Sequence, residues 1–263
     1  MDDEVEKVAI LRLTEEGSSN IDDMIAREFP LTLILNNQEL VTLLCSPVNL
    51  KYLAIGFLSS EGLLKSKDEI KQIIVDAERG VVRVETEESR ELDRDVLFKR
   101  LITSGCGRGV SFYNATDAAS QKVESRVEIS AHNVFTLVSD FQHRSQIYRM
   151  TGGVHSAALC DKESIIVFSE DIGRHNAIDK IMGKCLLEDI STDNRVIITS
   201  GRISSEILLK IAKRNIPILI SKSAPTDLGV KLADDLGVTL LGFVRGKRIN
   251  AYTNDWRIAP DGR

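Results

Sequence analysis

Short apolar segments separated by turns dominate the first third of the chain, a pattern typical of β-strands. Residues 29–35 and 40–44 flank an Asn-Asn pair, which predicts a β-hairpin. Residues 70–75 and 81–86 form a second pair of predicted strands around a charged, Gly-containing turn. The first part of the chain is therefore expected to be rich in strands.

One helix is expected between these two pairs of strands. Ser46 and Pro47 have the form of a helix start, with Ser46 as the N-cap and Pro47 in the first helical position. Apolar residues then recur at helical spacing from Leu50 to Leu58. Residues 15–20, by contrast, have the composition of a loop.

From about Ser130 onward, helical periodicity alternates with short apolar runs. Helices are expected at residues 134–148, 178–187, 204–214 and 228–236, and strands at 155–160, 165–169, 196–200, 217–221 and 239–244. This alternation predicts an α/β sandwich with at least partly parallel strands and helices on both faces.

The two patterns divide the chain into parts of different character. A polar, weakly periodic stretch suggests a boundary near residues 115–130. We expect a polar N-terminal segment (1–20), a smaller strand-rich α+β domain (21–125) and an α/β/α sandwich (126–263). The fold class is α/β for the larger part and α+β for the whole chain.

Composition and charge narrow the classes of function. With 263 residues and 43% hydrophobic side chains, the chain can bury one large or two modest cores. A net charge of −5 argues against general binding of nucleic acid. Residues 243–263 are the exception: they hold five Arg or Lys and two Asp, which favours a small anionic ligand there.

The chain shows no targeting or membrane signal. It opens with acidic residues where a secretory signal would be basic, and no apolar run approaches the roughly 20 residues of a membrane span. The four cysteines are scattered singly, without a C-x-x-C pair. We therefore expect free thiols in a reducing, cytoplasmic setting.

Three polar turns follow predicted strands of the second part, at residues 170–176, 199–206 and 221–227. Ligands of α/β sheets bind at the carboxyl ends of strands, where helix N-termini attract anions. The turns therefore predict a pocket for a phosphate-bearing ligand. The alternative is that their Ser, Thr and Asp residues only cap helices.

Two histidines stand near these turns. His175 could be a metal ligand, a general base or a hydrogen-bonded structural residue, but no second His or Cys lies at a ligand spacing from it. His155 follows a Gly-Gly pair that is typical of close backbone approach to a ligand or of a plain turn. No metal ion is expected.

Cys106 differs from the other cysteines in its neighbours. It lies in Ser104-Gly-Cys-Gly-Arg-Gly109, whereas Cys45 and Cys160 follow apolar residues. A thiol in an exposed loop with Arg108 nearby would have a lowered pKa and react as a thiolate. The alternative is a surface turn with an incidental cysteine.

Five motifs together resemble the FdhD/NarQ family. They stand in the same order as in that family, at residues 103–107, 151–155, 171–180, 200–206 and 242–248. The resemblance implies a sulfur carrier required for formate dehydrogenase activity. Such a carrier takes persulfide sulfur from a cysteine desulfurase and delivers it to the molybdenum cofactor, a bis(molybdopterin guanine dinucleotide). It also implies a homodimer, a cytidine-deaminase-like second domain, and binding of GDP in place of the cofactor's guanylate portion.

The same motifs supply the expected site residues. Cys106 is the expected nucleophile. The expected cofactor-binding residues come from three segments: Gly173, Arg174 and His175; Ser200, Gly201 and Arg202; and Phe243, Val244, Arg245, Gly246, Lys247 and Arg248. Their guanidinium and amide groups suit a pyrophosphate.

One departure from the family pattern and two rival functions bear on this interpretation. The family loop commonly reads C-G-x-C, but Gly109 stands in the second cysteine's place, so a single-cysteine carrier is favoured. A zinc nucleoside deaminase would need H-x-E and P-C-x-x-C, and the corresponding turns lack that Glu and both thiols. A non-catalytic cofactor-binding chaperone, which would not need Cys106, is the remaining alternative.

Overall fold

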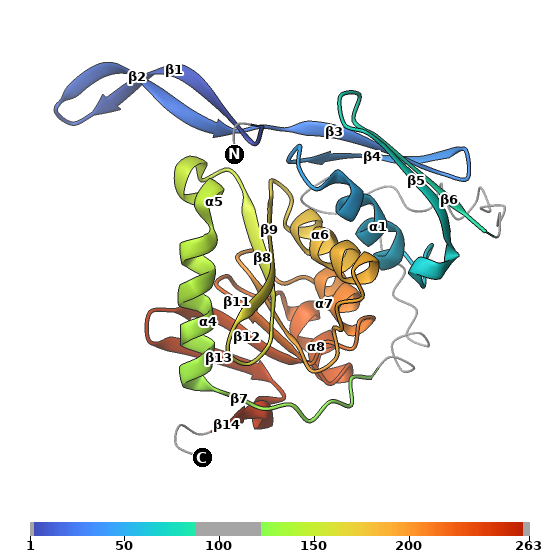
Figure 1. Cartoon of the computed structure of the whole chain (residues 1–263). Coiled ribbons are helices and arrows are strands. Elements are labelled where there is room, and N and C mark those ends of the chain that lie inside the picture. The colour runs from blue at the N-terminus through green and yellow to red at the C-terminus, as the bar shows by residue number, and fades with distance from the viewer. Residues whose placement is uncertain (1–2, 88–121, 260–263) are drawn as a thin grey trace.

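The computed structural model describes residues 3–87 and 122–259. Cys106 and Gly109 lie outside the described residues, as does much of the predicted boundary at 115–130. A small sheet with one helix lies beside a larger layered body, and a two-stranded arm projects from them (Figure 1).

The described elements follow in this order. The first part contains β1 (Val5–Thr14), β2 (Gly17–Ala26), β3 (Phe29–Leu35), β4 (Gln38–Cys45), α1 (Leu50–Ser60), β5 (Ile70–Asp76) and β6 (Val81–Thr86). The second part contains β7 (Ile129–Ser130), α4 (Ala131–Arg144), α5 (Gln146–Thr151), β8 (His155–Cys160), β9 (Ile165–Asp171), α6 (Arg174–Leu187), β10 (Val196–Thr199), α7 (Ser205–Ala212), β11 (Ile218–Ser221), α8 (Asp227–Asp235), β12 (Thr239–Arg245), β13 (Arg248–Thr253) and β14 (Ile258–Ala259).

The larger body is a three-layer sandwich around a six-stranded sheet. Its strand order is β13-β12-β11-β10-β8-β9, and β10, β11 and β12 run parallel. Alternate strand residues face opposite cores: Ile197 and Leu219 pack with α6, α7 and α8, whereas Ile198 and Ile220 pack with α4. The expected mixed sandwich with helices on both faces is confirmed.

The smaller sheet has the order β4-β3-β6-β5 and packs on α1. Leu31, Leu33 and Leu53 are fully buried in the core between them. Both predicted strand pairs are present, and the first turn places two Asn residues at positive φ, which Asn tolerates better than most residues.

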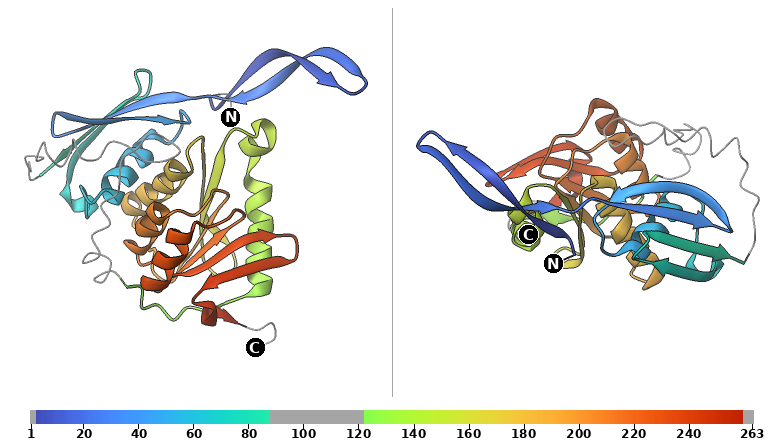
Figure 2. Two further views of the ribbon diagram at one scale, coloured as in Figure 1. Left: turned by 180° about the vertical axis from the view of Figure 1, so that it is seen from behind. Right: turned by 90° about the horizontal axis from the view of Figure 1, so that it is seen from above.

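Residues 1–20 were expected to be a polar segment with a loop at 15–20, but residues 5–26 form the β1–β2 hairpin. Only its base packs against the body, through Val5 and Met24 on Ile147 and Val154. Beyond that base most positions of both strands are exposed, and the apolar residues of β1 from Val8 to Leu13 do not alternate strictly with polar ones, so period-2 patterning does not mark these strands. Seen from above, the arm extends away from the sandwich on the side opposite the small sheet (Figure 2).

The predicted helix start at Ser46 was also wrong. Helix α1 begins at Leu50, after Asn49 in the left-handed conformation. The Ser46 amide instead donates to Asp171 Oδ2 (3.1 Å), and its hydroxyl accepts from the Ile172 amide (3.2 Å). The Ser46 hydroxyl, which would accept from a helix amide as an N-cap, thus accepts from a residue more than a hundred positions away in the sequence.

Two other elements differ from the sequence prediction. The single helix expected over 134–148 is broken into α4 and α5 at Ser145, whose hydroxyl bonds Phe141 O and Ser156 Oγ. Residues 248–253 were not predicted as a strand, yet they form β13 at the edge of the large sheet.

Helices α1 and α6 join the two bodies at very short range. A Cβ added at Gly56 would lie 1.7 Å from Asp179 O, and one added at Gly183 would lie 1.9 Å from Tyr52 O. The buried Asp179 carboxylate next to this crossing binds Lys210 Nζ (2.6 Å). Among the described helices, none is both long and apolar enough to cross a bilayer.

Candidate functional site

A pocket of about 610 Å³ opens where β10, β11 and β12 end. Because β8 runs antiparallel to β10, the start of β8 meets the same edge. The lining comes from four regions: Phe141, Gln142, Ser145, Tyr148 and Arg149 of the α4–α5 region; His155 and Ser156 of β8; Ser200, Lys222 and Ser223 after β10 and β11; and Arg245 and Gly246 at the end of β12. This volume suits a ligand of nucleotide size.

The pocket is cationic. Arg149, Lys222 and Arg245 line it, and no carboxylate is among the described lining residues. Partial burial, together with the charge of Arg245, lowers the pKa of Lys222. Three cations around one cavity favour an anionic ligand, and the partial desolvation of Lys222 strengthens its attraction for such a ligand.

The turn between β12 and β13 is shaped by a bulge at Phe243. Phe243 has a φ of 51°, and the pairing register shifts between Gly242 and Arg245. Bulges re-aim strand ends and are common beside functional sites. The guanidinium carbons of Arg245 and Arg248 lie 5.9 and 5.8 Å from the Phe243 ring centroid, within cation–π range. The Arg245 Nε donates to Lys222 O (2.9 Å), which fixes it to the β11 turn.

His155 and Ser200 lie together among the lining residues. The His155 Nδ1 is 3.4 Å from Ser200 Oγ, which also accepts from the Ser156 amide (3.0 Å). The Ser200 amide donates to Ser156 O (3.0 Å), so β8 holds the end of β10 in place. Burial lowers the pKa of His155, and nearby Arg174 and His175 lower it further, against the opposing effect of Asp171.

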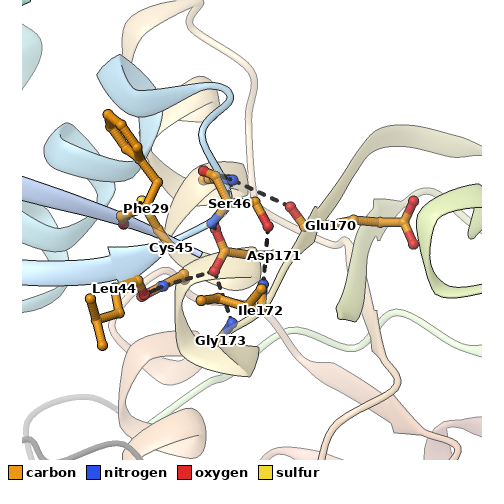
Figure 3. A network of polar contacts seen from close by, with 10 residues as sticks. Phe29, Leu44, Cys45, Ser46, Glu170, Asp171, Ile172 and Gly173 are labelled. Atoms are coloured by element: carbon orange, nitrogen blue, oxygen red, sulfur yellow. Dashed lines mark hydrogen bonds and ion pairs between the residues drawn. The ribbon is translucent and has the colours of Figure 1, made fainter. Parts of the chain in front are cut away.

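The 171–180 motif lies at the joint between the two bodies. Figure 3 shows the fully buried Asp171 between Ser46 of the first part and Gly173. Its carboxylate accepts from the Gly173 amide (2.8 Å) and Asn176 Nδ2 (2.8 Å) and pairs with the buried Lys180 (2.7 Å). The motif therefore stabilises the contact between the bodies.

Of the predicted binding residues, Arg174 and Gly201 pack against each other, His175 contacts α7, and Gly173 lies against Asn176 and Asp171. A Cβ on Gly201 would lie 2.8 Å from Arg174 Cβ, so this glycine allows close packing. His175 Nε2 pairs with Glu206 Oε2 of α7 (3.1 Å), and burial lowers the pKa of His175. Arg202 is exposed. None of these residues is among the described lining residues of the pocket.

Of the remaining predicted residues, Ser200, Arg245 and Gly246 line the pocket. Val244 is fully buried in the core beneath α4, while Lys247 and Arg248 are exposed on the turn. The expected pocket at the strand ends is thus present; the 151–155, 200–206 and 242–248 motifs each contribute part of its lining, whereas the 171–180 motif contributes none.

Sequence reasoning missed the pocket residues Arg149 and Lys222 as individual contacts. Lys222 stands in the 221–227 turn, which had been expected to contribute, so its position after a strand was the available signal. No sequence pattern pointed to Arg149, because only tertiary contacts place α5 beside the strand ends. The backbone amides of Ile147 and Tyr148, in the first turn of α5, donate to the Glu170 carboxylate (3.1 Å each). In Figure 3 the Glu170 side chain points away from Asp171.

The three described cysteines are all buried. Cys45 Sγ donates to Phe29 O (3.5 Å). Burial raises the pKa of Cys160 to about 12 and that of Cys185 to about 11. Since a thiol reacts as its thiolate, these two are poor nucleophiles at neutral pH.

These features define an α/β/α sandwich with a cationic pocket at the carboxyl ends of its parallel strands, joined to a smaller strand-rich body. The chain belongs to the FdhD/NarQ family, whose sequence model matches residues 26–259.

Relatives of similar length support this assignment. The chain is 45% identical to "Sulfur carrier protein FdhD" of Bacillus subtilis (strain 168), over 98% of this chain and 99% of that one. It is 42% identical to the protein of the same name from Staphylococcus aureus (strain MRSA252), over 95% and 94% of the two chains. The crystal structure of a putative formate dehydrogenase accessory protein from Desulfotalea psychrophila matches with a TM-score of 0.80 at 26% identity, over 97% of this chain and 100% of that one.

Proposed function

We propose that this protein is a cytoplasmic, homodimeric sulfur carrier that accepts persulfide sulfur on Cys106 from a cysteine desulfurase. It then transfers the sulfur to the bis(molybdopterin guanine dinucleotide) cofactor of a formate dehydrogenase. Family membership and the names of the relatives support the sulfur-carrier role.

The observation that carries the assignment of Cys106 is the burial of the other three cysteines. A carrier thiol must meet a thiol of another protein, and Cys45, Cys160 and Cys185 are enclosed in cores. Cys106 is the remaining one of four cysteines, with glycines on both sides and Arg108 nearby. It lies outside the described residues, so its assignment rests on its sequence and on the state of the others.

The chemistry balances without an added oxidant at the loading step. The Cys106 thiolate attacks the outer sulfur of the desulfurase persulfide; a new S–S bond forms, and the desulfurase cysteine leaves as a thiolate. Delivery places this sulfur on the cofactor as sulfide and regenerates the Cys106 thiolate, with two electrons supplied by the acceptor.

The pocket is the proposed site of the cofactor's pyrophosphate and guanylate portions. Arg149, Lys222 and Arg245 would bind the phosphates, and Tyr148 offers an aromatic ring at the same cavity. GDP is the expected mimic. The cytidine-deaminase-like architecture of the second domain and the absence of bound zinc remain predictions. Among the described residues, no three His, Cys, Asp or Glu side chains cluster as a metal site.

Mass spectrometry after incubation with a desulfurase and cysteine tests the loading step. We expect a gain of one sulfur, about 32 Da, on the Cys106 peptide and no gain in Cys106→Ala. Cys185→Ala is the matched control, because it removes a buried thiol and should load like the parent protein. Equal loading of Cys106→Ala, or sulfur on Cys160, would refute the assignment.

The same variant separates the carrier from a cofactor-binding chaperone that does not handle sulfur. The carrier requires Cys106 for active formate dehydrogenase, whereas the chaperone would still support activity in Cys106→Ala. Activity of the dehydrogenase matured with each variant distinguishes the two.

A further inference from the structure

His155 is the one imidazole among the described groups that line the cationic pocket. Its Nδ1 lies 3.4 Å from the Ser200 hydroxyl, which can donate to it. The other ring nitrogen, Nε2, has no hydrogen-bond partner among the residues that the structure describes. His155 can therefore offer Nε2 to a ligand.

Cationic side chains lie near this imidazole. Arg174 lies on α6, packed against β8, while Arg149, Lys222 and Arg245 line the pocket from α5 and from the ends of β11 and β12. His175, also on α6, is a buried imidazole whose own pKa is lowered by burial.

Two carboxylates of β9, Glu170 and Asp171, lie near His155, and both already have hydrogen-bond or ion-pair partners. Asp171 pairs with Lys180, and Glu170 accepts from the first amides of α5 and from Ser156 Oγ (3.2 Å). Neither provides a free counter-charge for His155. In the absence of a ligand the imidazole is therefore neutral at pH 7, as its lowered pKa also indicates.

An anion in the pocket would shift the protonation equilibrium of His155. Two phosphate charges within hydrogen-bonding range would offset the neighbouring cations and favour the imidazolium, whose Nε2–H can donate to a phosphate oxygen. Ser200 would then accept from Nδ1–H, since its hydroxyl can turn from donor to acceptor.

We propose that His155 binds the pyrophosphate of the cofactor as an imidazolium, so that ligand binding takes up one proton at this residue. The inference rests on the proposed function for the ligand, and it adds a proton-coupled contact to it. It makes His155 a binding residue whose contribution depends on pH.

The sign of the effect follows from linkage. Binding raises the pKa of His155, so protons are taken up between the lower pKa of the free protein and the higher pKa of the complex. Affinity rises as pH falls through this range, by about tenfold for each unit that separates the two values.

GDP-mannose is the appropriate probe, because its pyrophosphate is esterified at both ends and does not titrate near neutral pH. GDP itself carries a terminal phosphate that titrates near pH 6 and would confuse the proton count. Calorimetric titrations at pH 6.5 in buffers of different ionisation enthalpy then give the number of protons taken up.

We expect proton uptake by the parent protein and an affinity that increases about three- to tenfold from pH 8 to pH 5.5. His155→Gln keeps a neutral hydrogen-bonding side chain and should bind with less than about a twofold change over that range. His143→Gln, on the exposed face of α4, is the matched control and should behave like the parent. The C2–H resonance of His155 should also shift its titration to higher pH on binding, a readout that needs no variant.

The possible failures are distinguishable. GDP-mannose binding without proton uptake, or with an unchanged His155 titration, overturns this inference and leaves the cofactor site intact. No binding of either GDP or GDP-mannose at any pH contradicts the proposed cofactor site itself.

Discussion

Single charged residues decide what the pocket can hold. Lys222 and Arg245 are joined by the hydrogen bond from Arg245 Nε to Lys222 O, and both side chains line the cavity. Lys247 and Arg248, which stand in the same basic segment as Arg245, are not among the described residues that line the pocket. The structure thus divides one sequence motif into a part that lines the pocket and a part that does not.

The first prediction compares these two pairs. Lys222→Gln with Arg245→Gln should weaken GDP binding by about 2 to 4 kcal/mol, since charged hydrogen bonds contribute roughly 1.5 to 3 kcal/mol each and are not fully additive. Lys247→Gln with Arg248→Gln removes the same net charge and should weaken binding by less than about 1 kcal/mol, mainly by long-range attraction. Calorimetry on both folded double variants measures the difference, and equal losses would contradict the pocket assignment.

At the scale of elements, the crossing of α1 and α6 fixes one body on the other. Gly56 and Gly183 let the backbones touch, and two buried carboxylates complete the contact. Asp179 accepts from Ser60 Oγ of α1 (2.7 Å), and Asp171 accepts from the Ser46 amide. Buried carboxylates need such partners because desolvation penalises an unpaired charge.

The second prediction concerns Gly56. Gly56→Ala raises helix propensity by about 1 kcal/mol, yet its Cβ would meet the Asp179 carbonyl, which is backbone and cannot rotate away. We expect a net loss of about 1 to 3 kcal/mol in the free energy of unfolding in urea. Lys51→Ala, on an exposed position of the same helix, should be neutral or slightly stabilising. A Gly56→Ala variant as stable as the parent would show that the helices can separate without cost.

At the scale of the whole molecule, each of the three described cysteines is buried in a different hydrophobic core. Cys45 is in the core of the small sheet, Cys160 lies under α4, and Cys185 packs on the opposite face of the large sheet. Three separate cores thus enclose three thiols, while none of the described cysteines lies at the surface.

The third prediction is a thiol count. Native protein at pH 8 should react quickly with one equivalent of Ellman's reagent, and denatured protein with four. Cys106→Ala should leave no fast-reacting thiol in the native state. Fast reaction of two or more thiols in the native parent would contradict the burial of the remaining three.

The sequence by itself determined most elements of this protein, because side-chain periodicity is a local property. The strands at 29–35 and 81–86 and the helices near 178–187 and 228–236 follow from spacing alone. Where the local signal was not periodic, as in the arm of residues 5–26, or was overridden, as at Ser46, the prediction failed.

The tertiary structure alone decided which residues meet. His155, Ser200 and Arg245 come from three strands that become neighbours at one sheet edge only after the chain has crossed over, and Arg149 joins them because Glu170 holds α5 there. Arg174 and Gly201, equally prominent in the sequence, pack against each other instead. Residue type and spacing specify what a side chain can do, whereas the choice between ligand and core depends on long-range packing that short-range patterns do not encode.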